Sequence, residues 1–140
     1  MHDPFQPSRG DFGNFQLGYD IAPSSEFAEL EYIDENYVAS LLFKAPGTSV
    51  SVVVSAGQLE YWCECFELSA ANGGVNMQTL PIMRTRKADE RLHVAVYKNK
   101  LSFRNGAMFI SIDISDCLKE FVNCISNIWR ELEEKEDESW

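Results

Sequence analysis

The sequence predicts an α+β fold, in which a mainly antiparallel β-sheet is packed by one long amphipathic helix near the C-terminus. Two observations predict this class. Residues 92–113 contain two short turn signals, and together these place the large apolar side chains on one face of a three-stranded meander. Residues 115–133 then repeat apolar side chains at helical spacing, so this helix has one face to bury against the sheet.

The chain has 140 residues, the usual size of one domain, and 45% of them are hydrophobic. We therefore expect a single domain over residues 1–140. Residues 1–14 contain four turn-forming Pro and Gly residues without periodicity, which predicts an irregular arm. The sequence has neither an apolar run of membrane-spanning length nor the pattern of a secretory signal. A cytoplasmic protein without membrane contact is expected.

Alternating or valine-rich apolar patterns predict four strands in the N-terminal half. These strands cover residues 15–21, 37–44, 50–55 and 59–68. Pro46-Gly47 and Gly57-Gln58 are predicted as turns, because glycine and proline favour turn conformations. Residues 70–81 are predicted as a loop and residues 84–91 as a polar surface connection.

Residues 26–36 allow two interpretations. Phe27, Leu30 and Ile33 recur at helical spacing, whereas Leu30 and Tyr32 also alternate with polar neighbours as in a strand. The strand is favoured, because the turn residues 34–36 would then lead directly into the next strand. The helix remains open as the alternative.

The meander over residues 92–113 is the best-determined region. Asn105-Gly106 is a strong hairpin signal, because a type I′ turn needs positive φ at both positions. A second two-residue turn is predicted at Lys98-Asn99. The predicted partners across these turns are Val96 with Leu101, Phe103 with Met108, and Leu101 with Ile110. A slip of one residue in the pairing of either hairpin would move the apolar side chains to the wrong face.

The helix over residues 115–133 is predicted to begin with Ser115 as its N-cap, and Asp116 suits the positive end of the helix dipole. Its apolar stripe is expected to pack on the meander. This stripe comprises Leu118, Phe121, Val122, Ile125, Trp129 and Leu132, widened by Cys117, Cys124 and Ile128. Acidic residues at a helix C-terminus oppose the dipole, so residues 134–140 are predicted to form a frayed acidic tail.

No catalytic residue, metal site or cofactor site is predicted. Cys63 and Cys65 lack the spacing of a zinc knuckle, and Cys117 and Cys124 do not supply it either, so the four thiols are expected to fill gaps in the core. His93 is expected to face solvent on the side of the meander opposite the apolar face. Neither it nor His2 belongs to a known catalytic motif.

The charge distribution is the one unusual feature. The net charge is −10, and residues 26–67 hold eight acids against Lys44 alone, whereas residues 84–104 hold seven bases against two acids. Such a chain repels phosphate, so nucleic acid is not expected as a partner. A basic protein is the expected partner. An ordinary solvated surface is the plainer explanation of the same pattern.

The predicted strand over residues 59–68 places Glu60, Trp62 and Glu64 on one face. A tryptophan between two carboxylates suits a protein interface, where the aromatic side chain anchors and the charges steer. The alternative is a tryptophan at the rim of the sheet. The predicted partner-binding residues are Glu29, Glu31, Asp34, Glu35, Glu60, Trp62 and Glu64.

In size, charge and architecture the whole chain resembles the immunity proteins that protect bacteria from polymorphic or contact-dependent toxins. The resemblance implies a non-enzymatic protein that binds a cognate toxin domain, often a basic nuclease, and blocks its active site or substrate path. The acids at 26–35 and 60–67 would then be the contacts, and a DNA-mimicking inhibitor is a variant of this idea. The alternatives are a homodimeric chaperone of the type III secretion kind and a small enzyme without a recognisable motif. The oligomeric state does not follow from the sequence.

Overall fold

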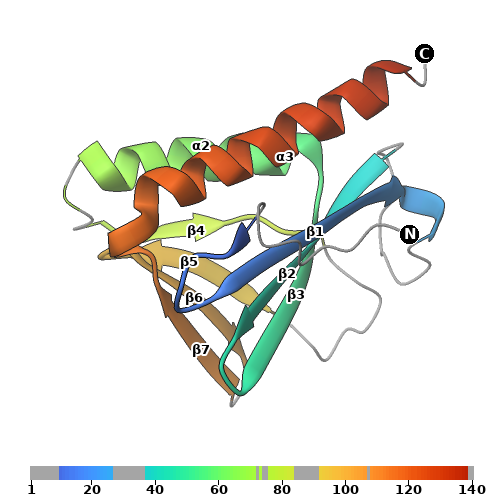
Figure 1. Cartoon of the computed structure of the whole chain (residues 1–140). Helices are drawn as coiled ribbons and strands as arrows, with labels where there is room; N and C mark the ends of the chain where they lie inside the picture. Colours follow the sequence, from blue (N-terminus) through green and yellow to red (C-terminus); the bar gives the residue numbers. More distant parts are fainter. Residues whose placement is uncertain are drawn as a thin grey trace.

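The computed structural model describes residues 10–26, 37–71, 73, 76–83, 92–106 and 108–138. Their strands form two antiparallel sheets, ordered β1-β2-β3 and β4-β5-β6-β7, and two long helices, α2 and α3, accompany them (Figure 1). The strands are β1 (Gln16–Pro23), β2 (Tyr37–Ala45), β3 (Thr48–Val54), β4 (Gln78–Leu80), β5 (His93–Tyr97), β6 (Lys100–Asn105) and β7 (Met108–Asp113). The helices are α2 (Ala56–Ala71) and α3 (Leu118–Glu138), with short 3-10 turns η1 (Ser24–Glu26) and η2 (Ser115–Cys117).

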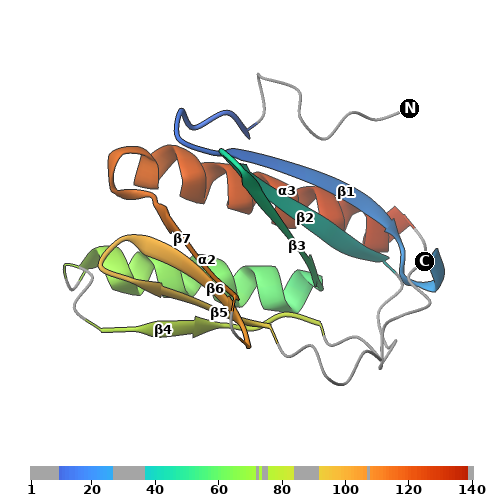
Figure 2. The ribbon, with the colours of Figure 1, turned by 90° about the horizontal axis from the view of Figure 1, so that it is seen from below.

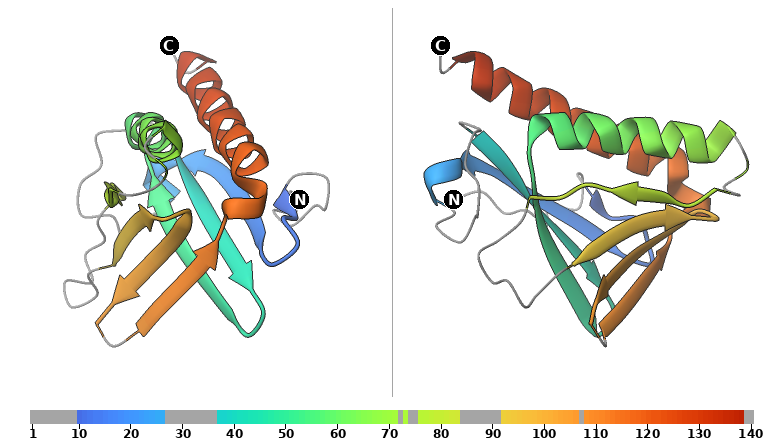
Figure 3. Two further views of the ribbon diagram at one scale, coloured as in Figure 1. Left: turned by 90° about the vertical axis from the view of Figure 1, so that its left-hand side faces the viewer. Right: turned by 180° about the vertical axis from the view of Figure 1, so that it is seen from behind.

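The two sheets lean together like the arms of a V, and α2 and α3 lie side by side across its open side (Figure 3). Seen from below, α3 lies behind β1 and β2, and α2 lies behind the β4–β7 sheet (Figure 2). The inner faces of both sheets and one face of each helix therefore enclose a common core. This architecture confirms the predicted α+β class. The expectation that the C-terminal helix packs on the meander is wrong, because α3 packs on β2 and α2, and it is α2 that covers the β4–β7 sheet.

The N-terminal sheet follows the period-2 pattern of its sequence. Leu17 pairs with Phe43, which in turn pairs with Val50, and all three side chains point into the core and are buried. Ala45 pairs with Thr48, so Pro46 and Gly47 form the tight turn between β2 and β3, and Gly47 has a φ of +77°. The strands predicted at 15–21, 37–44 and 50–55 are confirmed, and the observed ends lie within two residues of the predicted ones.

The β5–β6–β7 meander is confirmed, and so is the turn at Lys98-Asn99, where both residues have positive φ. The predicted register of β6 against β7 is wrong. Asn105 pairs with Met108, so the chain reverses one residue later than expected, and Gly106 has a φ of +56°. Each residue of β6 consequently meets a partner two positions further along β7. The observed pairs are Leu101 with Ile112 and Phe103 with Ile110. Because a shift of two keeps side chains on the same face, the apolar face survives the change.

Helix α3 begins and ends differently from the prediction. The Ser115 backbone N–H and hydroxyl both donate to Asp113 Oδ1, at 2.9 and 2.6 Å, so Asp113 supplies the acceptor that was expected of Ser115. These bonds, the hydroxyl first, hold the pKa of the Asp113 carboxyl below its usual value. The helix continues to Glu138, past the predicted end at residue 133, and Lys135 pairs with Glu138 at 3.9 Å in its last turn.

The predicted N-terminal arm folds back on the body from residue 10 onwards. The Phe12 ring stacks on Phe15 and meets the edge of Phe121, with ring centroids 4.9 and 5.7 Å apart. The Asn14 side-chain amide donates to the Asp113 carbonyl oxygen at 3.0 Å, beside the end of β7. Several predictions lie outside the described residues. They concern residues 1–9 of the arm, residues 27–36, whose helix or strand character was open, and the connection 84–91.

Two contacts join distant parts of the chain. The Tyr19 hydroxyl on β1 donates to the Glu131 carboxylate on α3 at 2.5 Å. The Met83 backbone N–H donates to the Val53 carbonyl oxygen at 2.8 Å, so the segment after β4 meets the outer edge of β3. Within the described residues, no helix combines the length and the apolar character needed to cross a bilayer.

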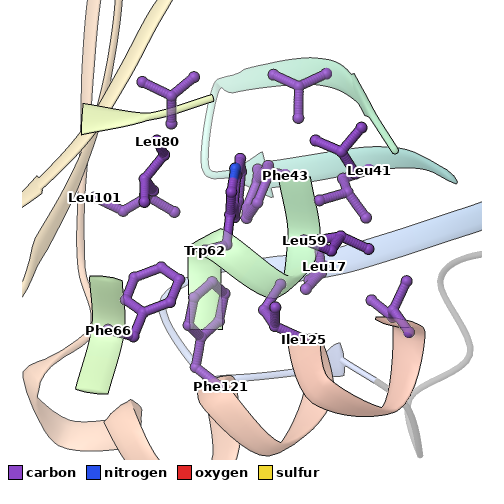
Figure 4. Close-up of a cluster of buried hydrophobic side chains, with 14 of the residues drawn as sticks. Leu17, Leu41, Phe43, Leu59, Trp62, Phe66, Leu80, Leu101, Phe121 and Ile125 are labelled. Atoms are coloured by element: carbon purple, nitrogen blue, oxygen red, sulfur yellow. The ribbon is translucent and has the colours of Figure 1, made fainter. Parts of the chain in front are cut away.

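The core centres on aromatic rings. Phe121 of α3 has no exposed surface and contacts Phe15, Phe43 and Phe66, with centroid distances of 5.9, 6.4 and 5.3 Å. Trp62 lies beside Phe43, with Phe66 and Phe121 on one side and Leu80 and Leu101 of the second sheet on another (Figure 4). The buried part of the predicted α3 stripe is Phe121, Ile125, Ile128 and Leu132. Leu118, Val122, Cys124 and Trp129 lie partly buried beside it.

Phe121→Ala is expected to lower the free energy of unfolding by about 3–5 kcal/mol, because it removes a buried ring that contacts Phe12, Phe15, Phe43 and Phe66. Denaturant unfolding followed by fluorescence would measure the change. Lys119→Ala, on the exposed side of the same helix, is the matched control and should change stability by less than about 0.5 kcal/mol. Equal effects of the two substitutions would contradict this account of the core.

Candidate functional site: the exposed face of helix α2

Residues 56–71 form a helix because a capping box starts it. The Gln58 backbone N–H donates to Ser55 Oγ at 3.2 Å, and the Ser55 backbone N–H donates to Gln58 Oε1 at 3.1 Å. The turn predicted at Gly57-Gln58 and the strand predicted at 59–68 are therefore wrong. The sequence of this stretch is rich in aromatic and cysteine residues with acids between them, which mimics the alternation of a strand, whereas its buried residues recur at helical spacing.

Trp62 belongs to the buried face of α2. It has no exposed surface, and its indole N–H donates to the Pro81 carbonyl oxygen at 2.6 Å, which ties α2 to the residue after β4. The prediction that Trp62 shares a face with Glu60 and Glu64 is wrong, because residues two apart on a helix point in directions about 200° apart. Trp62 is part of the core and is not available to a partner.

The opposite face of α2 carries acidic and apolar side chains together. Glu60, Glu64 and Glu67 are exposed, and Tyr61 and Leu68 are 48% and 56% exposed. On a helix, residues three, four and seven apart lie on one side, so these five side chains form one continuous surface, named here the α2 face. Helix α2 contains no basic residue between Ala56 and Ala71. The α2 face is thus a negatively charged surface with two apolar side chains exposed at its edge.

Of the predicted partner-binding residues, the structure brings Glu60 and Glu64 together, one turn apart on α2. Trp62 is excluded by burial. Glu29, Glu31, Asp34 and Glu35 lie outside the described residues. Tyr61 and Leu68 were not predicted as surface residues from the sequence. The signal that would have found them is the pair Ser55 and Gln58, whose S-x-x-Q spacing marks a helix start.

The cysteines are free thiols, and within the described residues no group of three or more His, Cys, Asp or Glu side chains is arranged to hold a metal ion. Cys63 and Cys65 are buried in α2, and Cys63 Sγ lies 3.6 Å from Ser126 Oγ of α3. Burial raises the pKa of both thiols above the usual value. Burial likewise raises the pKa of Cys117, and its acidic neighbours, Glu120 first, add to the effect. These thiols therefore carry little thiolate at neutral pH.

His93 is exposed on β5, on the side of the sheet away from the core, as predicted. Its register partner on β6 is Arg104.

No protein-family model, curated protein or solved structure matches this chain.

Ser55→Ala is expected to lower the free energy of unfolding by about 0.5–2 kcal/mol, because the first turn of α2 loses a capping acceptor. Chemical denaturation of the variant would measure this loss. Ser51→Ala, at an exposed position on β3, is the matched control and should be nearly neutral. A Ser55 variant as stable as the wild type would mean that α2 does not depend on its capping box.

Cys63 is expected to react with a thiol reagent more slowly in the native protein than in the unfolded chain, because it is both buried and raised in pKa. Its native rate should increase as the pH rises and the thiolate fraction grows. Peptide mapping by mass spectrometry after timed alkylation would give the rate at each cysteine. Equal native and unfolded rates at Cys63 would contradict its placement between α2 and α3.

Proposed function

We propose that this chain is a non-enzymatic, acidic binding protein of the toxin-immunity type, which neutralises a basic toxin domain in the cytoplasm by docking on it through the α2 face. The observation that carries the proposal is the joint exposure of Glu60, Glu64 and Glu67 with Tyr61 and Leu68 on one rigid helix. The size and net charge of −10 agree with such a role.

The two kinds of side chain on the α2 face have different effects on binding. Tyr61 and Leu68 offer apolar area that a partner can bury, and tyrosine is among the residues that contribute most to interface affinity. The three carboxylates attract a basic partner and accelerate association, particularly at low salt. A surface with both features favours a specific protein partner over simple solvation.

The neighbouring helix extends the negative surface. α3 lies beside α2, and the two helices together carry ten acids against three bases. Glu133, Glu134 and Asp137 are exposed on the last turns of α3. A nuclease toxin must have a basic surface to hold its nucleic acid substrate, and an acidic helix layer can compete for that surface. This is the sense in which the carboxylates would act as mimics of phosphate groups.

The charge-reversal variant Glu60→Lys with Glu64→Lys tests the proposal. The binding partner in the test is the product of the neighbouring open reading frame, which the proposal expects to encode the toxin domain, and titration calorimetry at two salt concentrations is the readout. We expect the double variant to bind at least about tenfold more weakly, and the wild-type affinity to fall as salt rises. The control is Asp20→Lys with Glu26→Lys, which changes the net charge equally at exposed positions on β1 and η1, outside both helices.

A second measurement separates this proposal from its rivals. Native pull-down combined with light scattering is expected to yield a complex with the toxin domain. A stable homodimer that instead captures a secreted effector would support a chaperone and overturn the immunity assignment. An affinity that is insensitive both to salt and to charge reversal on α2 would overturn the acidic docking face itself.

A further inference from the structure

The outer face of the β4–β7 sheet carries mainly positive charges, whereas the exposed faces of the two helices are acidic. Its side chains point away from the core, because the alternate residues Val94, Val96, Leu101 and Phe103 are the buried ones. The registers align the outward residues in three rows across the sheet. These rows are His93–Arg104–Phe109, then Thr79–Ala95–Ser102–Ser111, then Tyr97–Lys100–Asp113.

The middle row contains only small side chains, whereas the rows on both sides contain long ones. Residues two apart on a strand lie about 7 Å apart, so the two outer rows stand about 13 Å apart. The middle row of small side chains between them (Thr79, Ala95, Ser102 and Ser111) is named here the floor. The Ser102 hydroxyl on this floor donates to the Ala95 carbonyl oxygen at 3.4 Å. The floor therefore lets the backbone of another chain approach the sheet closely.

Cations lie over exposed aromatic rings at both ends of this floor. The Arg104 guanidinium carbon lies 5.5 Å from the centre of the Phe109 ring, and Lys98 Nζ lies 5.3 Å from the centre of the Tyr97 ring. Phe109 is 57% exposed and Tyr97 is 42% exposed, although both are large apolar side chains. Each ring thus holds a cation in place at the surface and leaves part of its own area uncovered.

The acidic helices do not cancel this positive face. α2 and α3 pack on the inner side of the sheets, so the sheet and its buried side chains separate their carboxylates from the outer face (Figure 3). Layers of a packed domain lie about 10 Å apart. At physiological salt, charges farther apart than about 8 Å are largely screened from each other. Among the described outward residues, an approaching ligand therefore meets Lys98, Lys100 and Arg104 against one carboxylate, that of Asp113 beside Lys100.

We propose that the outer face of β4–β7 is a second docking surface, which takes a short, extended, acidic segment of a protein. Lys100 and Arg104 lie four residues apart on β6, about 13 Å along the strand. An extended peptide laid along β6 has the same spacing, so carboxylates four residues apart on it can reach both cations while its backbone crosses Ser102. The exposed rings of Tyr97 and Phe109 would flank the segment.

Two kinds of polyanion suit this outer face, and the net charge of the whole molecule decides between them. Aromatic rings with cations on an open sheet also suit single-stranded nucleic acid. A long polyanion, however, extends past this small face into the field of a molecule with a net charge of −10. A short acidic peptide fits within the positive area and avoids that repulsion. The acidic peptide is therefore the favoured occupant.

A fluorescent peptide of alternating glutamate and serine is the probe, and anisotropy of the full chain with this peptide is the readout. We expect binding that weakens from about 0.05 M to about 0.5 M NaCl. Lys100→Glu with Arg104→Glu should weaken it about tenfold or more. Ser111→Trp, which fills the floor without a change of charge, should also weaken it. Circular dichroism would verify that both variants are folded.

The matched control is Lys119→Glu with Arg130→Glu, which makes the same charge change on the exposed side of α3 and should leave peptide binding unaltered. An equal loss of peptide binding in this control would show that only the net charge of the protein matters, and it would overturn the proposal. So would the absence of peptide binding at low salt, or tighter binding of a single-stranded oligonucleotide than of the peptide. None of these outcomes bears on the α2 face, whose carboxylates stay intact in every variant.

Discussion

The burial of Phe121 among aromatic rings is the contact on which the rest of the structure depends. Its partners are Phe12 in the N-terminal arm, Phe15 just before β1, Phe43 on β2 and Phe66 on α2. One side chain of α3 thus contacts the arm, the first sheet and the other helix. Since Phe43 also meets Phe103 of β6 at 5.0 Å, the same cluster extends to the second sheet.

This arrangement determines which surfaces are free for binding. Two sheets that meet in a V have inner faces too wide to bury against each other, and the two helices supply the missing cover. Each helix then has an outward face that no core residue constrains, and each sheet has an outer face. The outward face of α2 carries carboxylates beside Tyr61 and Leu68. The outer face of the β4–β7 sheet carries cations beside aromatic rings. The molecule presents two surfaces of opposite charge, both held on regular structure.

The sequence predicted β1 to β3 and β5 to β7 well because period-2 burial is a robust signal. Strand β4 was missed, because its three residues (Gln78–Leu80) lie in the stretch 70–81 that was predicted as a loop. Even the error in the β6–β7 register preserved the buried face, because a turn moved by one residue shifts the pairing by two. Helix α2 was mispredicted for the reverse reason. Its exposed Tyr61 and Leu68 blur the apolar stripe that would mark a helix, and the acids between aromatic residues imitate a strand. The feature that concealed the helix is the same one that suggests its function. The opposition of Arg104 and Phe109 across two strands depends on register and could not be read from either residue alone.

The bond from Met83 to Val53 has a consequence for the protein in a crowded cell. Edge strands with unpaired backbone groups are templates on which other chains can add strands and form aggregates. β3 is such an edge, and the segment after β4 occupies part of it. The Asn14 amide similarly takes up the carbonyl oxygen at the end of β7, the edge of the other sheet. The edge of β3, a valine-rich strand on which another chain could otherwise add a strand, is therefore partly covered by the protein's own chain.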